Sequence, residues 1–118
     1  MVLPHTPSAQ GDFRAYLPRF REENFAQNQR FVEELKQIAT TKGVSPSQLA
    51  IAWVLAKGRN IIPVIGARKR TQLEESLKAV EVELSPEELS RIEAAIPAPA
   101  IAGTRYDEHQ MKMLDSER

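Results

Sequence analysis

The alternation of apolar and polar side chains predicts four helices along the chain. Apolar residues recur every three or four positions over residues 22–41 and charged residues take the other face, which is typical of an amphipathic helix. Gly43 follows and can adopt the left-handed backbone that ends a helix. Two helices are expected to open at Ser45 and Ser85, because each serine precedes a proline and has glutamine or glutamate three positions later. A further helix is expected over residues 71–80, where the opening Thr-Gln-Leu-Glu matches a capping box.

Two apolar runs lie between these helix starts. Residues 49–56 hold no polar side chain, so the helix that contains them is expected to be buried on every side. Residues 60–65, Asn-Ile-Ile-Pro-Val-Ile, are typical of a short buried strand, with Pro63 near its end because proline cannot donate to a ladder. The predicted order is helix, helix, strand, helix, helix. A single strand leaves its backbone unpaired, so neighbouring strands must come from a partner or from a larger sheet.

The chain divides into an irregular segment at 1–21, a structured part at 22–97 and a tail at 98–118. Its 118 residues carry 16 basic and 16 acidic side chains, a neutral balance that argues against a nucleic-acid or anionic membrane partner. The absence of cysteine excludes a disulfide scaffold, a thiolate metal site and a cysteine nucleophile. No apolar run is long enough to cross a bilayer and no secretory leader is recognisable, so we expect a cytoplasmic protein.

The strongest candidate for a functional site is the stretch 62–76, in which a predicted strand ends in Gly66 and a capped helix follows. Five cations and no acid lie between Lys57 and Arg70. A helix N-terminus presents free amides that attract phosphate, and arginine can bond phosphate oxygens in pairs. This order favours a phosphate site clamped by Arg68 with Lys69 or Arg70; a solvated basic turn is the alternative reading.

Other kinds of site are poorly supported. Two predicted helices around a Gly-Val-Ser turn resemble a DNA-binding helix-turn-helix motif, but the second helix has no polar side chain that could contact base edges. His5 and His109 lie far apart in the sequence and lack a partner at ligand spacing, so a metal site is not expected.

Several motifs occur here in a recognisable order: Asp-Phe-Arg-Ala-Tyr-Leu-Pro-Arg-Phe, Ser-Pro-Ser-Gln-Leu-Ala-Ile-Ala-Trp-Val-Leu-Ala, Ile-Pro-Val-Ile-Gly-Ala-Arg-Lys-Arg-Thr-Gln-Leu-Glu-Glu-Ser and Gly-Thr-Arg-Tyr. With them, the chain resembles the C-terminal third of an aldo-keto reductase of the bacterial and plant type. The resemblance runs from about Asp12 to the end. It implies a (β/α)₈ barrel in which residues 61–65 form the eighth strand and the helix after Thr71 is the eighth helix. A complete barrel needs about 250 residues, so the expected fold class is an α-rich α/β C-terminal piece of a TIM barrel.

The resemblance also implies NADP(H) as cofactor, with this chain binding the 2′-phosphate end. The cofactor-binding residues it implies are Gly66, Ala67, Arg68, Gln72, Glu75 and Ser76. By position, the Ala67 backbone and Arg68 meet the phosphate, Gln72 lies against the adenine, and Glu75 and Ser76 approach its amino edge. Many members of the family carry lysine-serine in place of Gly66-Ala67, arginine in place of Gln72 and asparagine in place of Ser76.

The family's catalytic aspartate, tyrosine, lysine and histidine have no matching motif in this sequence. By resemblance the function is therefore that of a cofactor-binding segment of an NADPH-dependent reductase of aldehydes and ketones, expected to be inactive alone. Self-association, or association with the missing N-terminal part, would supply the neighbouring strands. The alternative is a small helical interaction module.

Overall fold

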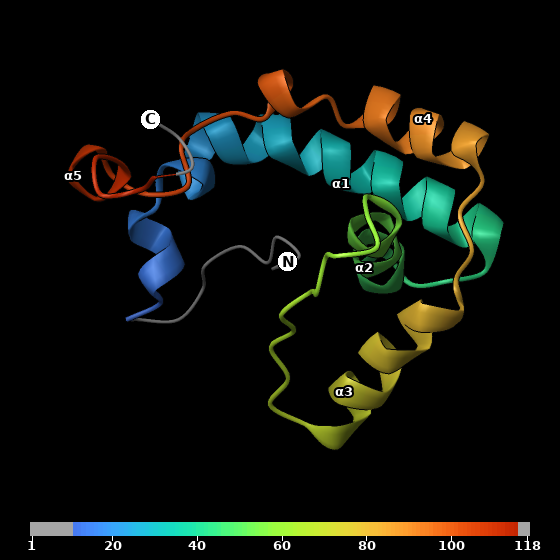
Figure 1. The fold of residues 1–118 in the computed structure, drawn as a ribbon. Coiled ribbons are helices and arrows are strands. Elements are labelled where there is room, and N and C mark those ends of the chain that lie inside the picture. The colour runs from blue at the N-terminus through green and yellow to red at the C-terminus, as the bar shows by residue number, and fades with distance from the viewer. Residues whose placement is uncertain (1–10, 116–118) are drawn as a thin grey trace. The chain divides into compact units, whose positions relative to one another are not determined.

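The computed structural model describes residues 11–115. Its α-helices are α1 (Glu22–Lys42), α2 (Pro46–Ala56), α3 (Arg70–Leu77), α4 (Pro86–Ala95) and α5 (Glu108–Met111) (Figure 1). Short 3₁₀ turns lie at Phe13–Tyr16, Pro18–Phe20, Lys78–Glu81 and Ala98–Ala100. The chain forms two compact units: unit 1 is Glu33–Ile96, and the described part of unit 2 is residues 11–32 with 97–115.

The expected helix boundaries are confirmed where local capping sets them. Ser45 Oγ accepts from the Gln48 amide at 3.2 Å while Gln48 Oε1 accepts from the Ser45 amide at 3.0 Å. Ser85 and Glu88 form the same reciprocal pair at 3.1 Å in both directions. Gly43 has a φ of 76°, the left-handed conformation expected after α1. These contacts satisfy helix-terminal amides that would otherwise lack acceptors.

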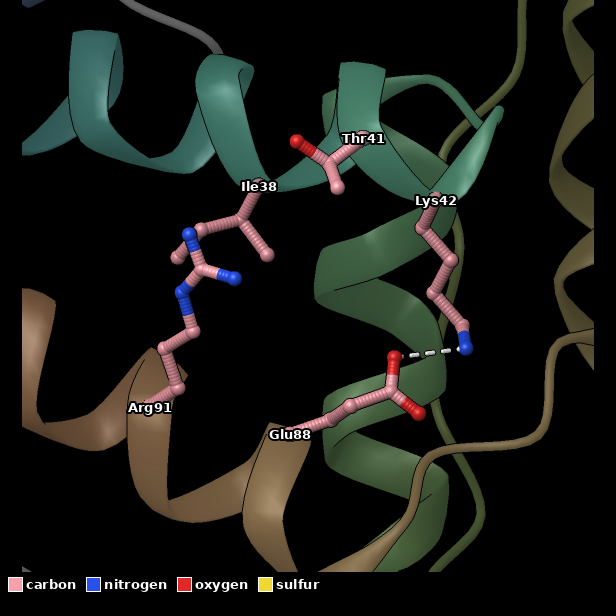
Figure 2. A pocket seen from close by; sticks show the side chains of 5 residues that line it. All are labelled: Ile38, Thr41, Lys42, Glu88 and Arg91. Atoms are coloured by element: carbon pink, nitrogen blue, oxygen red, sulfur yellow. Dashed lines mark hydrogen bonds and ion pairs between the residues drawn. The ribbon is translucent and has the colours of Figure 1, made fainter.

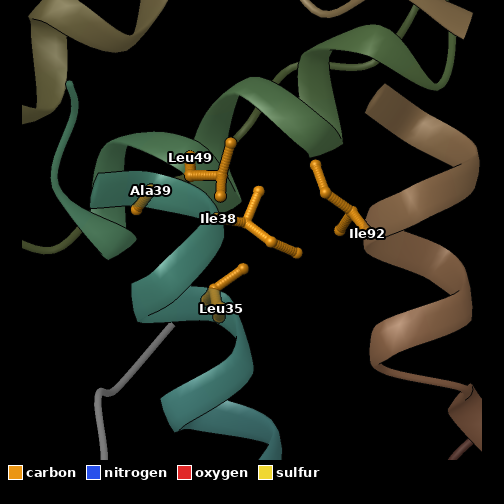
Figure 3. Packing of buried hydrophobic residues seen from close by; sticks show 5 residues of the cluster. All are labelled: Leu35, Ile38, Ala39, Leu49 and Ile92. Carbon is orange, nitrogen blue, oxygen red and sulfur yellow. The ribbon is translucent and has the colours of Figure 1, made fainter. Parts of the chain in front are cut away.

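The core of unit 1 lies where α1, α2 and α4 meet. Figure 3 shows the buried side chains converging from these three helices. They are Leu35, Ile38 and Ala39 from α1, Leu49 from α2 and Ile92 from α4. On α1, Ile38 and Ala39 follow Leu35 by three and four positions, the helical spacing that the apolar pattern predicted.

The prediction that residues 49–56 would be buried on every side is wrong for this chain. Only Leu49 and Ala52 of α2 are buried, and Ile51, Trp53 and Val54 keep part of their surface exposed. Helix α2 meets the core and the turn at Lys78–Glu81. The remaining part of its apolar circumference has too few neighbours to cover it.

The predicted strand at 60–65 is likewise not formed. Residues 61–67 have no regular secondary structure, and no strand occurs anywhere in the described range 11–115. Ile62 is 87% exposed and Val64 97% exposed, the opposite of a buried strand. A strand needs a neighbouring backbone for its ladder, and the helical surroundings offer none.

The start of α3 also differs from the expectation. The helix begins at Arg70, its N-cap is Lys69, and it passes into a 3₁₀ turn after Leu77. The oxygen that caps it belongs to Gln72, so the box predicted from Thr71 is wrong. Thr71 lies inside the helix, where its side chain cannot serve as the N-cap.

Unit 2 is tied together by amide side chains of α1. Asn28 accepts from the Ala102 amide at 2.8 Å and donates to the Ala102 carbonyl at 2.9 Å. Gly103 has a φ of 80°, and a Cβ there would lie 2.9 Å from the Pro18 carbonyl oxygen and 2.8 Å from Asn24 Nδ2. The ends of the segments predicted at 1–21 and 98–118 lie outside the described residues, as does His5. In the described range, no helix is long and apolar enough to cross a membrane.

Candidate functional site

The candidate phosphate segment lies in unit 1, where the irregular stretch 61–67 enters α3. Gly66, Ala67 and Arg68 precede the helix and are exposed. A Cβ placed on Gly66 would meet no atom within 4 Å, so open space adjoins the backbone there. The segment is accessible to a ligand from solvent.

The side chain of Gln72 caps the N-terminus of its own helix, α3. Its Oε1 accepts from the Arg68 amide at 2.9 Å and from the Lys69 amide at 3.0 Å. The amides of Arg70 and Thr71, the first two of the helix, have no acceptor within residues 11–115. Gln72 therefore occupies the amides of Arg68 and Lys69, and the amides of Arg70 and Thr71 remain open to an anion.

The cations of the segment have no acidic neighbour to neutralise them. Arg68, Lys69 and Arg70 are exposed, and none of the three forms an ion pair in the part of the chain that the structure describes. Lys57, at the start of the same basic stretch, does have a partner: its Nζ lies 2.5 Å from Glu93 Oε1. The positive potential is therefore concentrated at the N-terminus of α3, where the helix dipole has the same sign.

The helical part of the candidate site is anchored to the body of unit 1. Gln48 Nε2 donates to the Glu75 carbonyl at 2.9 Å and so links α2 to α3. The turn that follows α3 buries Ala79, which is 1% exposed. Gln72, Glu75 and Ser76 are spaced three and four positions apart, so they share one face of α3. That face is held in place from its C-terminal side.

A shallow pocket of about 260 Å³ lies elsewhere in unit 1, between α1 and α4 (Figure 2). Its lining residues are Ile38, Thr41, Lys42, Glu88 and Arg91. Lys42 Nζ donates to Glu88 Oε2 at 2.6 Å across it. None of the six residues predicted for the cofactor lines this pocket.

Ion pairs also set the protonation of two glutamates in unit 1. The Lys42 ammonium, helped by the Ser85 amide, holds the pKa of Glu88 below its usual range. The Lys57 ammonium does the same for the pKa of Glu93, which also accepts from the Trp53 indole at 3.3 Å. Both carboxylates therefore stay ionised at neutral pH. No cluster of three metal-ligating side chains occurs within the described range.

Residues 4–97 match the family model that is described as "Aldo/keto reductase family". The chain belongs to the aldo/keto reductase family. It is 38% identical over 97 residues to "Aldo-keto reductase yakc [NADP(+)]" of Schizosaccharomyces pombe, a match that covers 82% of this chain and 28% of that protein. It is 37% identical over 89 residues to "Probable aldo-keto reductase 1" of Glycine max, covering 75% of this chain and 26% of that protein. The chain thus spans little more than a quarter of the length of these curated relatives.

Within this aldo/keto reductase chain, the predicted cofactor residues fall into two groups. Gly66, Ala67 and Arg68 lie on the irregular approach, and Gln72, Glu75 and Ser76 on one face of α3. The groups are joined by the hydrogen bond from the Arg68 amide to Gln72. The sequence analysis missed the capping role of Gln72; a glutamine three positions after an N-cap was the feature that could have revealed it.

Proposed function

We propose that this aldo/keto reductase chain binds the 2′-phosphate end of NADP(H) at the N-terminus of α3. In this proposal the chain is a piece of a (β/α)₈ barrel, with residues 61–65 as its eighth strand and α3 as its eighth helix. The observation that carries the proposal is the coincidence at one place of three unpaired cations, two open helix amides and the segment expected from the family resemblance. One relative carries NADP(+) in its printed name, which supports the choice of cofactor.

The residues present fit a phosphate. The open amides of Arg70 and Thr71 are donors at the positive end of a helix dipole, the arrangement by which helix termini bind anions. Arg68 adds a planar guanidinium that can donate two parallel hydrogen bonds to phosphate oxygens. The space beside Gly66 lets a ligand approach the backbone closely. A neutral adenosine would use none of these charged contacts.

The adenine would lie on the face of α3 that carries Gln72, Glu75 and Ser76. Gln72 now uses its oxygen to cap Arg68 and Lys69, which leaves its amide nitrogen as a donor. Glu75 offers a carboxylate acceptor for an exocyclic amino group. The anchor from Gln48 to the Glu75 backbone fixes this face relative to α2.

Bound NADPH supplies the hydride that reduces a carbonyl group. This chain's residues bind and orient the far end of that cofactor, and they supply no proton donor to a carbonyl oxygen, because the family's catalytic motifs are not found in the sequence. We therefore propose that the chain alone does not turn over aldehydes or ketones. The missing strands and catalytic groups would come from the N-terminal part of a reductase or from another copy.

The affinity expected for the isolated site is low because the rest of a cofactor pocket is not provided by these residues. A dissociation constant in the millimolar range, about −4 kcal/mol, is a reasonable target for measurement. An exposed site is also screened by salt over about 8–10 Å at physiological ionic strength. Binding of a 2′-phosphorylated adenosine should therefore weaken as salt is added.

The test is an NMR titration of the amides of residues 66–76 with adenosine 2′-phosphate and with adenosine. The phosphorylated nucleotide should shift these amides more strongly, and Arg68→Ala should weaken its binding several-fold with little effect on adenosine. Arg59→Ala is the matched control, since it removes an exposed arginine from the same basic stretch but from outside the predicted site. Equal responses to both nucleotides, or equal effects of the two variants, would show that the cations are only a solvated turn.

A further inference from the structure

The shallow pocket between α1 and α4 is a second candidate binding site in unit 1 (Figure 2). Helix α1 contributes Ile38, Thr41 and Lys42 to its lining, and α4 contributes Glu88 and Arg91. Its volume of about 260 Å³ lies just below the roughly 300–1,000 Å³ that is typical of sites for larger organic ligands. A ligand that fits this pocket is therefore small, with one ring or a short chain.

The charged side chains that line the pocket leave one positive charge uncompensated. Both oxygens of Glu88 are in use, because Oε2 accepts from Lys42 Nζ at 2.6 Å and Oε1 accepts from the Ser85 amide at 3.1 Å. Arg91 is exposed, and its guanidinium forms no ion pair within residues 11–115. Lys42 and Glu88 balance each other, so the charge of Arg91 is the one that a ligand can neutralise.

This single charge favours a carboxylate over a phosphate. A carboxylate carries one negative charge, and its two oxygens match the planar fork of an arginine. A phosphate monoester carries about −1.5 to −2 charges at pH 7, which exceeds the charge available and would be repelled by Glu88. The pocket also offers apolar surface from Ile38 and from the aliphatic stem of Arg91. The hydroxyl of Thr41 already donates to the Gln37 carbonyl at 3.0 Å, so Arg91 is the donor left for an anion.

We propose that the pocket between α1 and α4 binds a small organic monocarboxylate, with the carboxylate on Arg91 and the apolar body against Ile38. Figure 2 shows the ion pair of Lys42 with Glu88 on the side of the pocket away from Arg91. That pair keeps the charge of Glu88 from repelling the ligand. The ligand contacts both helices and binds the folded chain only, so it stabilises unit 1. The site is separate from the phosphate segment and does not depend on the proposed function.

The test is an NMR titration of the full chain with sodium benzoate, with benzyl alcohol as a neutral compound that carries the same ring. Benzoate should shift the amides of residues 38–42 and 88–92, and its ring protons should show nuclear Overhauser effects to the Ile38 methyl groups. Benzyl alcohol and phenyl phosphate should each bind several-fold more weakly at these amides. Benzoate shifts confined to residues 66–76 would overturn the proposal, because the anion would then be responding to the unpaired cations before α3.

Variants of the chain test the charges one at a time. Arg91→Gln should weaken benzoate binding about tenfold, whereas Arg59→Gln, which removes another exposed arginine, should leave it unchanged. Glu88→Gln should tighten benzoate binding several-fold, because it frees Lys42; glutamine can still cap α4, as Gln48 caps α2. Equal effects of the two arginine variants, equal binding of benzoate and benzyl alcohol, or weaker binding by Glu88→Gln would overturn the proposal. The nucleotide titration reads other amides, so the two proposals can fail separately.

Discussion

Leu49 is the residue whose truncation should damage unit 1 most. Its side chain is 0% exposed and lies between α1 and α4, against Ile38 and Ile92 (Figure 3). Burial of a leucine side chain contributes about 1.5–3 kcal/mol, and the cavity left by Leu→Ala brings the usual loss to about 2–5 kcal/mol. A core as small as this one rarely supplies more than about 3–5 kcal/mol in total. Leu49→Ala should therefore remove most of the net stability.

Trp53 provides the measurement, since it is the chain's one tryptophan and packs against the same cluster. Urea unfolding followed by its fluorescence should shift to a much lower midpoint in Leu49→Ala or lose its cooperative transition. Leu49→Met keeps the volume and should cost less than about 1.5 kcal/mol. Leu73→Ala is the matched control, because Leu73 on α3 is 44% exposed. If Leu49→Ala and Leu73→Ala had the same small effect, the three-helix core would not be what holds unit 1 together.

Three further outcomes follow from particular contacts. Gly103→Ala should release the segment after residue 97, because φ is positive at Gly103 and a Cβ on that residue would overlap the backbone of Pro18. Hydrogen exchange of residues 98–114 should then rise. Gly66→Ala is the control and should change nothing in unit 1, because open space surrounds Gly66. Glu93→Gln should make the free energy of unfolding depend less on pH in the acid range, as urea midpoints measured across that range will report. Lys57 lowers the pKa of Glu93 in the folded state. The stability that this ion pair contributes is therefore present at neutral pH and lost below about pH 4. Ser45→Ala and Ser85→Ala should each destabilise unit 1 by about 1 kcal/mol, measured by circular dichroism during urea unfolding, and Ser→Gly at the same sites by only a few tenths.

The helix starts were predictable from sequence because the contacts that set them are local. Ser45 and Ser85 each hydrogen-bond a residue three positions later, so the spacing in the sequence is enough to predict the contact. The same reasoning misplaced the start of α3, since Thr71 and Gln72 both follow residues that can cap and the spacing alone does not choose between them. The side chain of Gln72 decides it by reaching back to two amides.

The predicted strand and the buried α2 failed for a different reason. Both predictions assumed that an apolar run of residues is buried, but a run is buried only when other parts of the protein cover it. Ile62 and Val64 have strand-forming side chains and no neighbouring backbone to pair with. The positions of the candidate cofactor residues could be predicted as a segment, and their role there stays a prediction until the nucleotide titration is made.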